Sequence, residues 1–189
     1  LAMAVRLKQA GIDDFVLLER GDDVGGTWRD NTYPGAACDV PSHLYSYSFA
    51  PNHRWSRAFS PQGEILDYLR DVARRHGIVP HLRLGTGVAC MRWDAARSRW
   101  VVETDAAGDA AGAPGVVTAD VVVGAMGALS EPRTPDIPGI DGFAGTIFHS
   151  AAWDHAHDLA GERVAVIGTG ASSIQFVPEI QKQAAQVHV

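Results

Sequence analysis

The stretch that most constrains the fold is a glycine turn placed between a strand pattern and a helix pattern. Residues 163–167 read Arg-Val-Ala-Val-Ile, as in a buried strand, and residues 171–185 have the composition of a helix. The turn between them reads Gly-Thr-Gly-Ala-Ser-Ser. Gly168 permits a tight bend, Gly170 lets a pyrophosphate approach the backbone, and Ser173 replaces the usual third glycine with another small residue. The pattern predicts a dinucleotide site at the helix N-terminus, where free N–H groups meet phosphate.

The glycine turn leaves two alternatives open. A purely structural turn would also use small residues at these positions. The residue that distinguishes NAD from NADP through the ribose 2′ position would lie just after Val189, so the turn does not choose between the two.

Composition excludes several other classes of protein. The chain has 189 residues, 46% of them hydrophobic, and its 16 basic against 22 acidic residues give a net charge of −6. Basic residues form no run, which disfavours a nucleic-acid partner. The longest apolar run, residues 119–129, is shorter than the about 20 residues of a membrane span. The two cysteines, Cys38 and Cys90, have neither disulfide-framework nor zinc-site spacing, so we expect a cytoplasmic protein.

Helix and strand patterns follow one another along the chain. The expected helices cover Leu1–Ala10, which closes on Gly11, and residues 61–76; the expected strands cover residues 14–19, 82–93, 100–104 and 116–126. A proline-punctuated linker, 132–139, precedes the last strand–turn–helix. This order predicts an α/β fold of two tandem Rossmann-like, dinucleotide-binding units. The first helix has no N-cap and residues 186–189 resemble the start of a strand, so we expect truncation at both ends.

A second cluster of candidate residues follows the strand at 14–19. Glu19 ends that strand, where a carboxylate can accept hydrogen bonds from ribose hydroxyls. Gly25 and Gly26 then let the backbone lie against a bulky ligand. Trp28 and Tyr33 could wall a flat ring system, although an ordinary core would use aromatic residues in the same way, and Glu19 could be a solvated strand-end acid.

A longer motif lies between the linker and the glycine turn. The run from Phe143 through Gly145, His149 and Trp153 to Asp154 matches the pattern F-x-G-x-x-x-H-x-x-x-W-[P/D] at every fixed position. It resembles the fingerprint of type I Baeyer–Villiger monooxygenases, which are class B flavin-dependent enzymes. The segment from Glu19 to Phe49 is likewise similar to the FAD-domain segment of flavin-containing and Baeyer–Villiger monooxygenases.

The resemblance implies FAD and NADP(H) as cofactors and a division of the chain between them. Residues 1–140 would belong to the FAD-binding domain, without its first strand and glycine turn, and residues 141–189 would hold the fingerprint linker and the start of the NADP-binding domain. The contacts with FAD implied by the resemblance are Glu19, Gly26, Thr27, Trp28, Arg29, Asp39, Tyr45 and the backbone at Val88; those with NADP are the 37–39 turn, Gly168, Thr169, Gly170, Ala171, Ser172, Ser173 and Gln175.

The resemblance also implies catalytic roles. Asp39 would orient the active-site arginine, which the family carries farther along the chain, although an aspartate in a Cys-Asp-Val-Pro turn is also an ordinary turn former. His149 and Trp153 would act on domain motion, or would be packed linker residues. Met126 stands where the family has threonine beside the flavin, so a side-chain role there is in doubt. His149, His155 and His157 lie close in sequence, but no carboxylate spacing completes a metal site and we expect none.

The implied reaction uses NADPH, oxygen and a ketone. Oxygen would be inserted next to the carbonyl through a C4a-peroxyflavin, giving an ester or lactone, with water excluded from the flavin site. One alternative is a flavin-containing monooxygenase that oxidises nitrogen or sulfur. An alternative of another class is a non-catalytic nucleotide-binding fragment, since without the first βα turn we expect the isolated chain to bind FAD poorly and to be inactive. Oligomeric state is not indicated.

Overall fold

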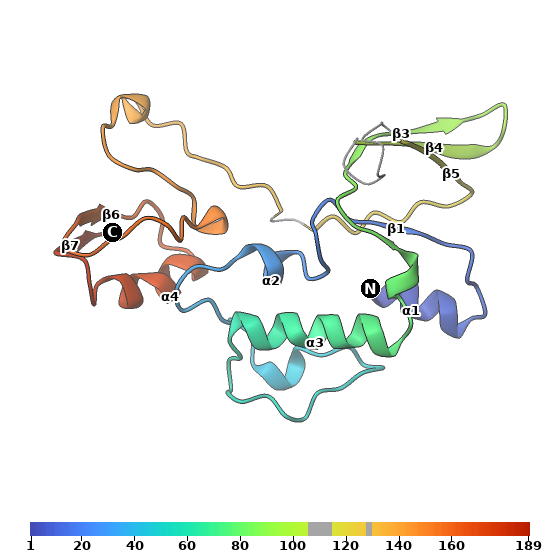
Figure 1. Cartoon of the computed structure of the whole chain (residues 1–189), viewed down its shortest axis with the longest axis horizontal. Helices are drawn as coiled ribbons and strands as arrows, with labels where there is room; N and C mark the ends of the chain where they lie inside the picture. The colour runs from blue at the N-terminus through green and yellow to red at the C-terminus, as the bar shows by residue number, and fades with distance from the viewer. Residues whose placement is uncertain (106–114, 128–129) are drawn as a thin grey trace. The chain divides into compact units, whose positions relative to one another are not determined.

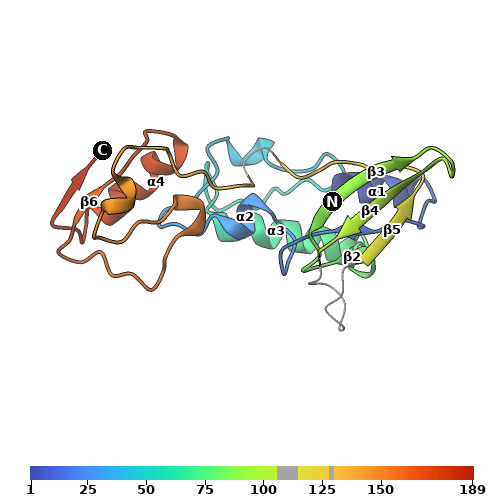
Figure 2. The same ribbon diagram turned by 90° about the horizontal axis from the view of Figure 1, so that it is seen from above.

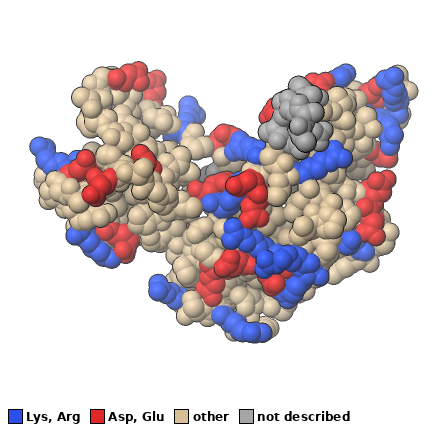
Figure 3. Space-filling model, in the orientation of Figure 1, with Lys and Arg blue, Asp and Glu red and all other residues tan. Residues whose placement is uncertain are grey.

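The computed structural model describes residues 1–105, 115–127 and 130–189, which form two compact units (Figure 1). The first unit comprises Leu1–Gly26 and Leu69–Ala128, and the second comprises Thr27–Tyr68 and Leu129–Val189. No helix in the described parts of the chain is long and apolar enough to cross a membrane. Basic and acidic side chains are intermingled on the face drawn in Figure 3.

The second unit contains the predicted strand–turn–helix. Strand β6 (Arg163–Ala165) pairs in parallel with β7 (Gln186–His188), and helix α4 (Ala171–Ile180) connects them. A parallel pair joined by a helix is the Rossmann-type βαβ connection, so this part of the predicted α/β fold is confirmed. The predicted strand opening at 186–189 is also confirmed.

A small apolar core holds this βαβ connection together. Tyr33, Leu159, Phe176 and Ile180 are buried, and Trp153 and the valines of β6 and β7 pack against them. Ile180 is 1% exposed. Because Tyr33 lies far before α4 in the sequence, the core fixes a distant loop to the nucleotide helix.

The first unit begins with helix α1 (Ala2–Gln9), followed by a left-handed Gly11 with a φ of 78°, as the helix-ending pattern predicts. Strand β1 (Leu17–Leu18) pairs in parallel with β2 (Leu82–Arg83). Helix α3 (Gln62–Arg75), of which residues 69–75 belong to this unit and 62–68 to the second, confirms the helical period and buries Ile65 and Val72 completely. The first unit also contains the 3-10 turn η2 (Val79–His81).

The short elements of the second unit are α2 (Thr27–Asp30) and the 3-10 turns η1 (Ser42–Leu44), η3 (Ile140–Gly142) and η4 (Ser150–Ala152).

An antiparallel sheet completes the first unit (Figure 2). Its strands are β3 (Val88–Asp94), β4 (Arg99–Thr104) and β5 (Gly115–Ala119), in that order. Asp94 accepts hydrogen bonds from the backbone of Ala96 and Arg97, and Ser98 has a φ of 51°, so residues 95–98 form a tight hairpin loop between β3 and β4.

Several of the expected strands and helices are shorter than predicted or divided. The expected strand over 82–93 is divided into β2 and β3, which belong to different sheets. The strand at 14–19 is reduced to β1, and the helix expected to reach residue 185 ends at Ile180, after Pro178 removes a helical N–H and the chain turns to pair with Glu162. The prediction of one continuous strand over 116–126 is wrong. Strand β5 ends at Ala119, and no described strand pairs with residues 121–126, where Val121 is 74% exposed. An apolar sequence becomes a strand only where it has a hydrogen-bonded neighbour.

Candidate functional site

The glycine turn before α4 has an open backbone. Gly168 has a φ of 116°, and no described atom lies within 4 Å of the place where a Cβ at Gly168 or Gly170 would stand. Ser173 is 7% exposed and its hydroxyl donates to the Gly170 carbonyl at 2.8 Å, which fits the need for a small residue there. The first amides of α4 have no acceptor within the helix. The turn therefore offers N–H groups and space to an anionic group.

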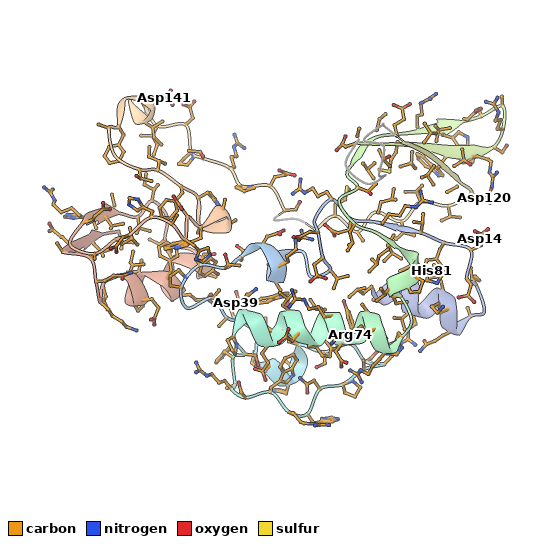
Figure 4. All side chains as sticks on the ribbon, in the orientation of Figure 1. Asp14, Asp39, Arg74, His81, Asp120 and Asp141 are labelled. Carbon is orange, nitrogen blue, oxygen red and sulfur yellow. The ribbon has the colours of Figure 1, made fainter. Side chains whose placement is uncertain are left out.

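The turn that carries Asp39 lies beside the N-terminal end of α3 (Figure 4). The Cys38 amide donates to the Ser60 carbonyl at 2.9 Å, and the Gln62 amide donates to the Ala36 carbonyl at 2.9 Å. Cys38 is 2% exposed, and burial raises the pKa of its thiol, whereas Asp39 is exposed. The fold thus buries the cysteine and presents the neighbouring carboxylate at the surface of this unit.

Trp28 of α2 is in contact with Tyr45, the residue just after η1. The Trp28 indole donates to the Tyr45 hydroxyl at 2.9 Å, and their rings meet edge to face at 5.5 Å. Burial raises the pKa of Tyr45, and the hydrogen bond from Trp28 opposes that shift. Arg29 pairs with Asp30 through Nε and Oδ1 at 2.7 Å. Two predicted cofactor residues, Trp28 and Tyr45, are therefore brought together.

Three candidate residues lie in the first unit. Glu19 directly follows β1, and one of its carboxylate oxygens accepts the Gly21 amide at 2.8 Å. Gly26 has a φ of 51°, and no described atom lies within 4 Å of its Cβ position. Val88 begins β3 and is 41% exposed. Strand-end carboxylate and open glycine backbone are both present, but their roles toward a cofactor stay predictions.

The motif at Phe143–Asp154 packs on α4 through its tryptophan. Trp153 contacts Phe176 at 5.3 Å and Phe148 at 5.1 Å between ring centroids. His149 begins η4, and its Nδ1 accepts the Ala151 amide at 3.0 Å, so a neutral ring carries its proton on Nε2. The Phe143 ring lies over Gly145, where a Cβ would come within 2.5 Å of it. Tryptophan and glycine thus have packing reasons for their places in the motif.

The clustered histidines use their rings for local contacts. His155 Nε2 lies 2.7 Å from the Thr32 hydroxyl, and His157 Nε2 lies 3.0 Å from the Glu162 carboxylate. Within residues 1–105, 115–127 and 130–189, no group of three histidine, cysteine, aspartate or glutamate side chains is placed to hold a metal ion.

The second unit contains surface hollows of different composition. One, of about 330 Å³, is lined by Trp153 and the residues that follow it, together with Pro34 and Gln183. Another, of about 530 Å³, is lined by residues between Ser42 and Ala58, and none of the candidate residues described above contributes to it. Only the first hollow therefore contains a predicted site residue.

The comparison with protein families decides what these features belong to. Residues 9–189 match the model of the flavin-binding monooxygenase-like family. The chain belongs to this family. Both the glycine turn at Gly168 and the Phe143–Asp154 motif lie within the matched residues, so the family assignment rests on nearly the whole chain.

Relatives within the flavin-binding monooxygenase-like family are closely similar to the chain. A Baeyer–Villiger monooxygenase of Streptomyces coelicolor is 60% identical over 96% of this chain and 33% of its own length. The structure resembles the OTEMO complex with FAD and NADP, with a TM-score of 0.85 and 36% identity over 97% of this chain and 35% of the other. It also resembles ε-caprolactone-bound cyclohexanone monooxygenase, with a TM-score of 0.85 and 35% identity over 98% of this chain and 36% of the other. The resemblance to Baeyer–Villiger monooxygenases and the Rossmann-type fold are confirmed, and the chain spans about a third of these relatives.

The structure adds one contact that the sequence did not reveal. Gln175 was predicted to contact NADP, but its side-chain amide bonds to both backbone groups of Ala37 and to the Tyr33 hydroxyl. These positions are separated by some 138 residues. No local spacing signals such a pair, because the two segments lie far apart in the sequence.

Proposed function

We propose that the protein carrying this chain is an FAD- and NADPH-dependent monooxygenase that inserts one oxygen atom beside a ketone carbonyl, producing an ester or lactone. The observation that carries the proposal is the packing of Trp153, from the complete Phe143–Asp154 fingerprint, on Phe176 of the helix that opens at Gly168–Gly170. The fingerprint and the dinucleotide-type turn are thus parts of one compact unit. The names of the relatives, with FAD, NADP and a lactone in their structures, point the same way.

The residues of the chain fit both cofactors. Gly168 and Gly170 leave space at the start of α4 for the NADP pyrophosphate, where the amides of α4 would bind it. Glu19 would accept hydrogen bonds from the FAD ribose, and Gly26 would admit the cofactor close to the backbone. When bound, the flavin supplies the oxygen chemistry and NADPH supplies the electrons.

The remaining candidate residues would position the cofactor and the catalytic arginine. Asp39, exposed beside the buried Cys38, would hold an arginine guanidinium over developing negative charge. Burial raises the pKa of Tyr45, which with Trp28 would pack beside the flavin. His149, with its proton on Nε2, would donate a hydrogen bond during domain motion.

The proposal is tested by product analysis on a protein of the relatives' full length that carries this chain. NADPH, ¹⁸O₂ and a panel of cyclic and linear ketones would be supplied, with one sulfide and one tertiary amine, and products read by mass spectrometry. Esters or lactones with one labelled oxygen are expected. A sulfoxide or an amine N-oxide as the only product would mean that the protein is a heteroatom-oxidising monooxygenase. Hydrogen peroxide as the only product would contradict oxygen insertion.

A further inference from the structure

The Gln175 side chain reproduces a strand-like backbone pairing with Ala37. Its Oε1 accepts the Ala37 amide at 3.2 Å, and its Nε2 donates to the Ala37 carbonyl at 2.9 Å. The same Oε1 accepts the Tyr33 hydroxyl at 3.0 Å. The amide orientation is fixed by this set, because only the oxygen can accept from an N–H and only the nitrogen can donate to a carbonyl.

These bonds use the whole accepting capacity of the Gln175 amide and half of its donating capacity. Oε1 already has two donors, which is its full capacity, and one of the two Nε2 hydrogens is donated to the Ala37 carbonyl. A half-buried Gln175 that turned toward a ligand would leave the Ala37 amide and carbonyl without these partners, at the cost of their desolvation.

Packing independently fixes the same turn on α4. Gly35 has a φ of 78°, and a Cβ there would lie 2.8 Å from the Gln175 carbonyl oxygen and 3.0 Å from Glu179 Cγ. The Tyr33 ring meets Phe176 edge to face at 5.9 Å. Backbone, ring and side-chain amide therefore all hold residues 33–37 against one stretch of the helix.

Residues 37 and 38 are also held by backbone contacts with residues 60 and 61. Ala37 forms an antiparallel bridge with Pro61, and the Cys38 amide donates to the Ser60 carbonyl. Asp39 comes next, so only one residue separates it from the Gln175 pairing at Ala37.

We propose that Gln175 is a positioning residue, which holds the Asp39 turn in fixed register with the nucleotide helix α4. The consequence for turnover rests on the proposed function, since it assumes that Asp39 serves the flavin side and α4 the NADP side. The pairing itself is independent of that function. Loss of the pairing releases the turn while leaving Gly168–Gly170 intact, so it raises the mobility of residues 33–40 and lowers the rate of oxygen insertion.

The test uses three variants of the full-length protein. Gln175→Met keeps the length of the side chain and removes all three hydrogen bonds, whereas Tyr33→Phe removes one and keeps the ring on Phe176. Gln181→Met makes the same change at an exposed glutamine just after α4. The measurements are amide hydrogen exchange over residues 33–40 without ligands, NADP⁺ affinity, and kcat, NADPH KM and peroxide release during turnover.

Gln175→Met is expected to exchange about 10- to 100-fold faster over residues 33–40, as for loss of two or three hydrogen bonds. The kcat for the oxygenated product should fall about tenfold and peroxide release should rise, and any loss of NADP⁺ affinity should accompany the faster exchange. Tyr33→Phe should change exchange in the same direction by about fivefold, and Gln181→Met should change nothing.

Weakened NADP⁺ binding with unchanged exchange would show that the Gln175 amide faces the dinucleotide, and would overturn the proposal. Unchanged exchange and unchanged turnover would overturn it as well. Faster exchange in a protein that makes no oxygenated product from any ketone would support the pairing and reject the proposed function. If Gln175→Met does not fold, the exchange measured on Tyr33→Phe decides between the same outcomes.

Discussion

The β6–α4–β7 connection and the run 121–126 have similar apolar sequences but different structures. Val164 and Val166, in and just after β6, pack against the core around Phe176. Val121 and Val123 are 74% and 53% exposed, and no described strand pairs with them. The difference teaches that an apolar, β-branched run favours a strand, but that the run forms a strand only where a neighbouring strand pairs with it.

The largest expected difference in unfolding free energy is between two substitutions on α4, one buried and one exposed. Phe176→Ala removes a ring that is 7% exposed and contacts Tyr33 and Trp153, so we expect a loss of about 3–5 kcal/mol in unfolding free energy. Ile174→Ala, at a site 70% exposed on the same helix, should cost less than about 0.5 kcal/mol. Urea unfolding monitored by circular dichroism measures both. Equal effects would mean that the βαβ connection has no core of its own.

The second prediction compares two left-handed glycines of the same unit. Gly35→Ala combines backbone strain with overlap on the α4 backbone, for an expected cost of about 2–4 kcal/mol. Gly161 has a φ of 73°, but no described atom lies within 4 Å of its Cβ position, so Gly161→Ala carries the strain alone, about 1 kcal/mol. The difference between the two unfolding free energies measures the close approach. A difference near zero would mean that the close approach of Gly35 to α4 does not help to hold the turn.

The sequence predicted those parts of the fold that depend on neighbouring residues. The Gly168–Gly170 turn, the glycine end of α1 at Gly11, and α3 are local patterns of period, cap and turn, and each is confirmed. Long-range pairing escaped prediction. The sequence did not show that Gln175 meets Ala37, or that residues 121–126 have no strand beside them, because both depend on segments far along the chain.

The third prediction tests the exposed run directly. Val166→Ala should cost about 1–2 kcal/mol, since it deletes two methyl groups beside the core. Val123→Ala in this chain should stay within about 0.5 kcal/mol. The same substitution should also be measured in a protein of the relatives' full length. A loss of unfolding free energy that rises there to match Val166→Ala would mean that residues outside this chain cover the run. A cost at Val123 already equal in this chain would contradict its exposure.

The smallest effect concerns the two cysteines, one in each unit. Cys38 is 2% exposed and burial raises the pKa of its thiol, whereas Cys90 is exposed. Because only thiolates react, Cys38 should be modified by a maleimide at least about tenfold more slowly than Cys90 at pH 8, as mass spectrometry of the native protein would show.

The folded protein holds the Cys38 proton more tightly than the unfolded chain does, so this thiol's contribution to stability is present below the ordinary thiol pKa and declines as pH rises through it. Cys38→Ala should therefore flatten the loss of stability between pH 8 and 10, and Cys90→Ala should leave that slope unchanged. Equal modification rates would mean that the turn before Asp39 opens readily, and would count against the tight hold of Gln175 on Ala37.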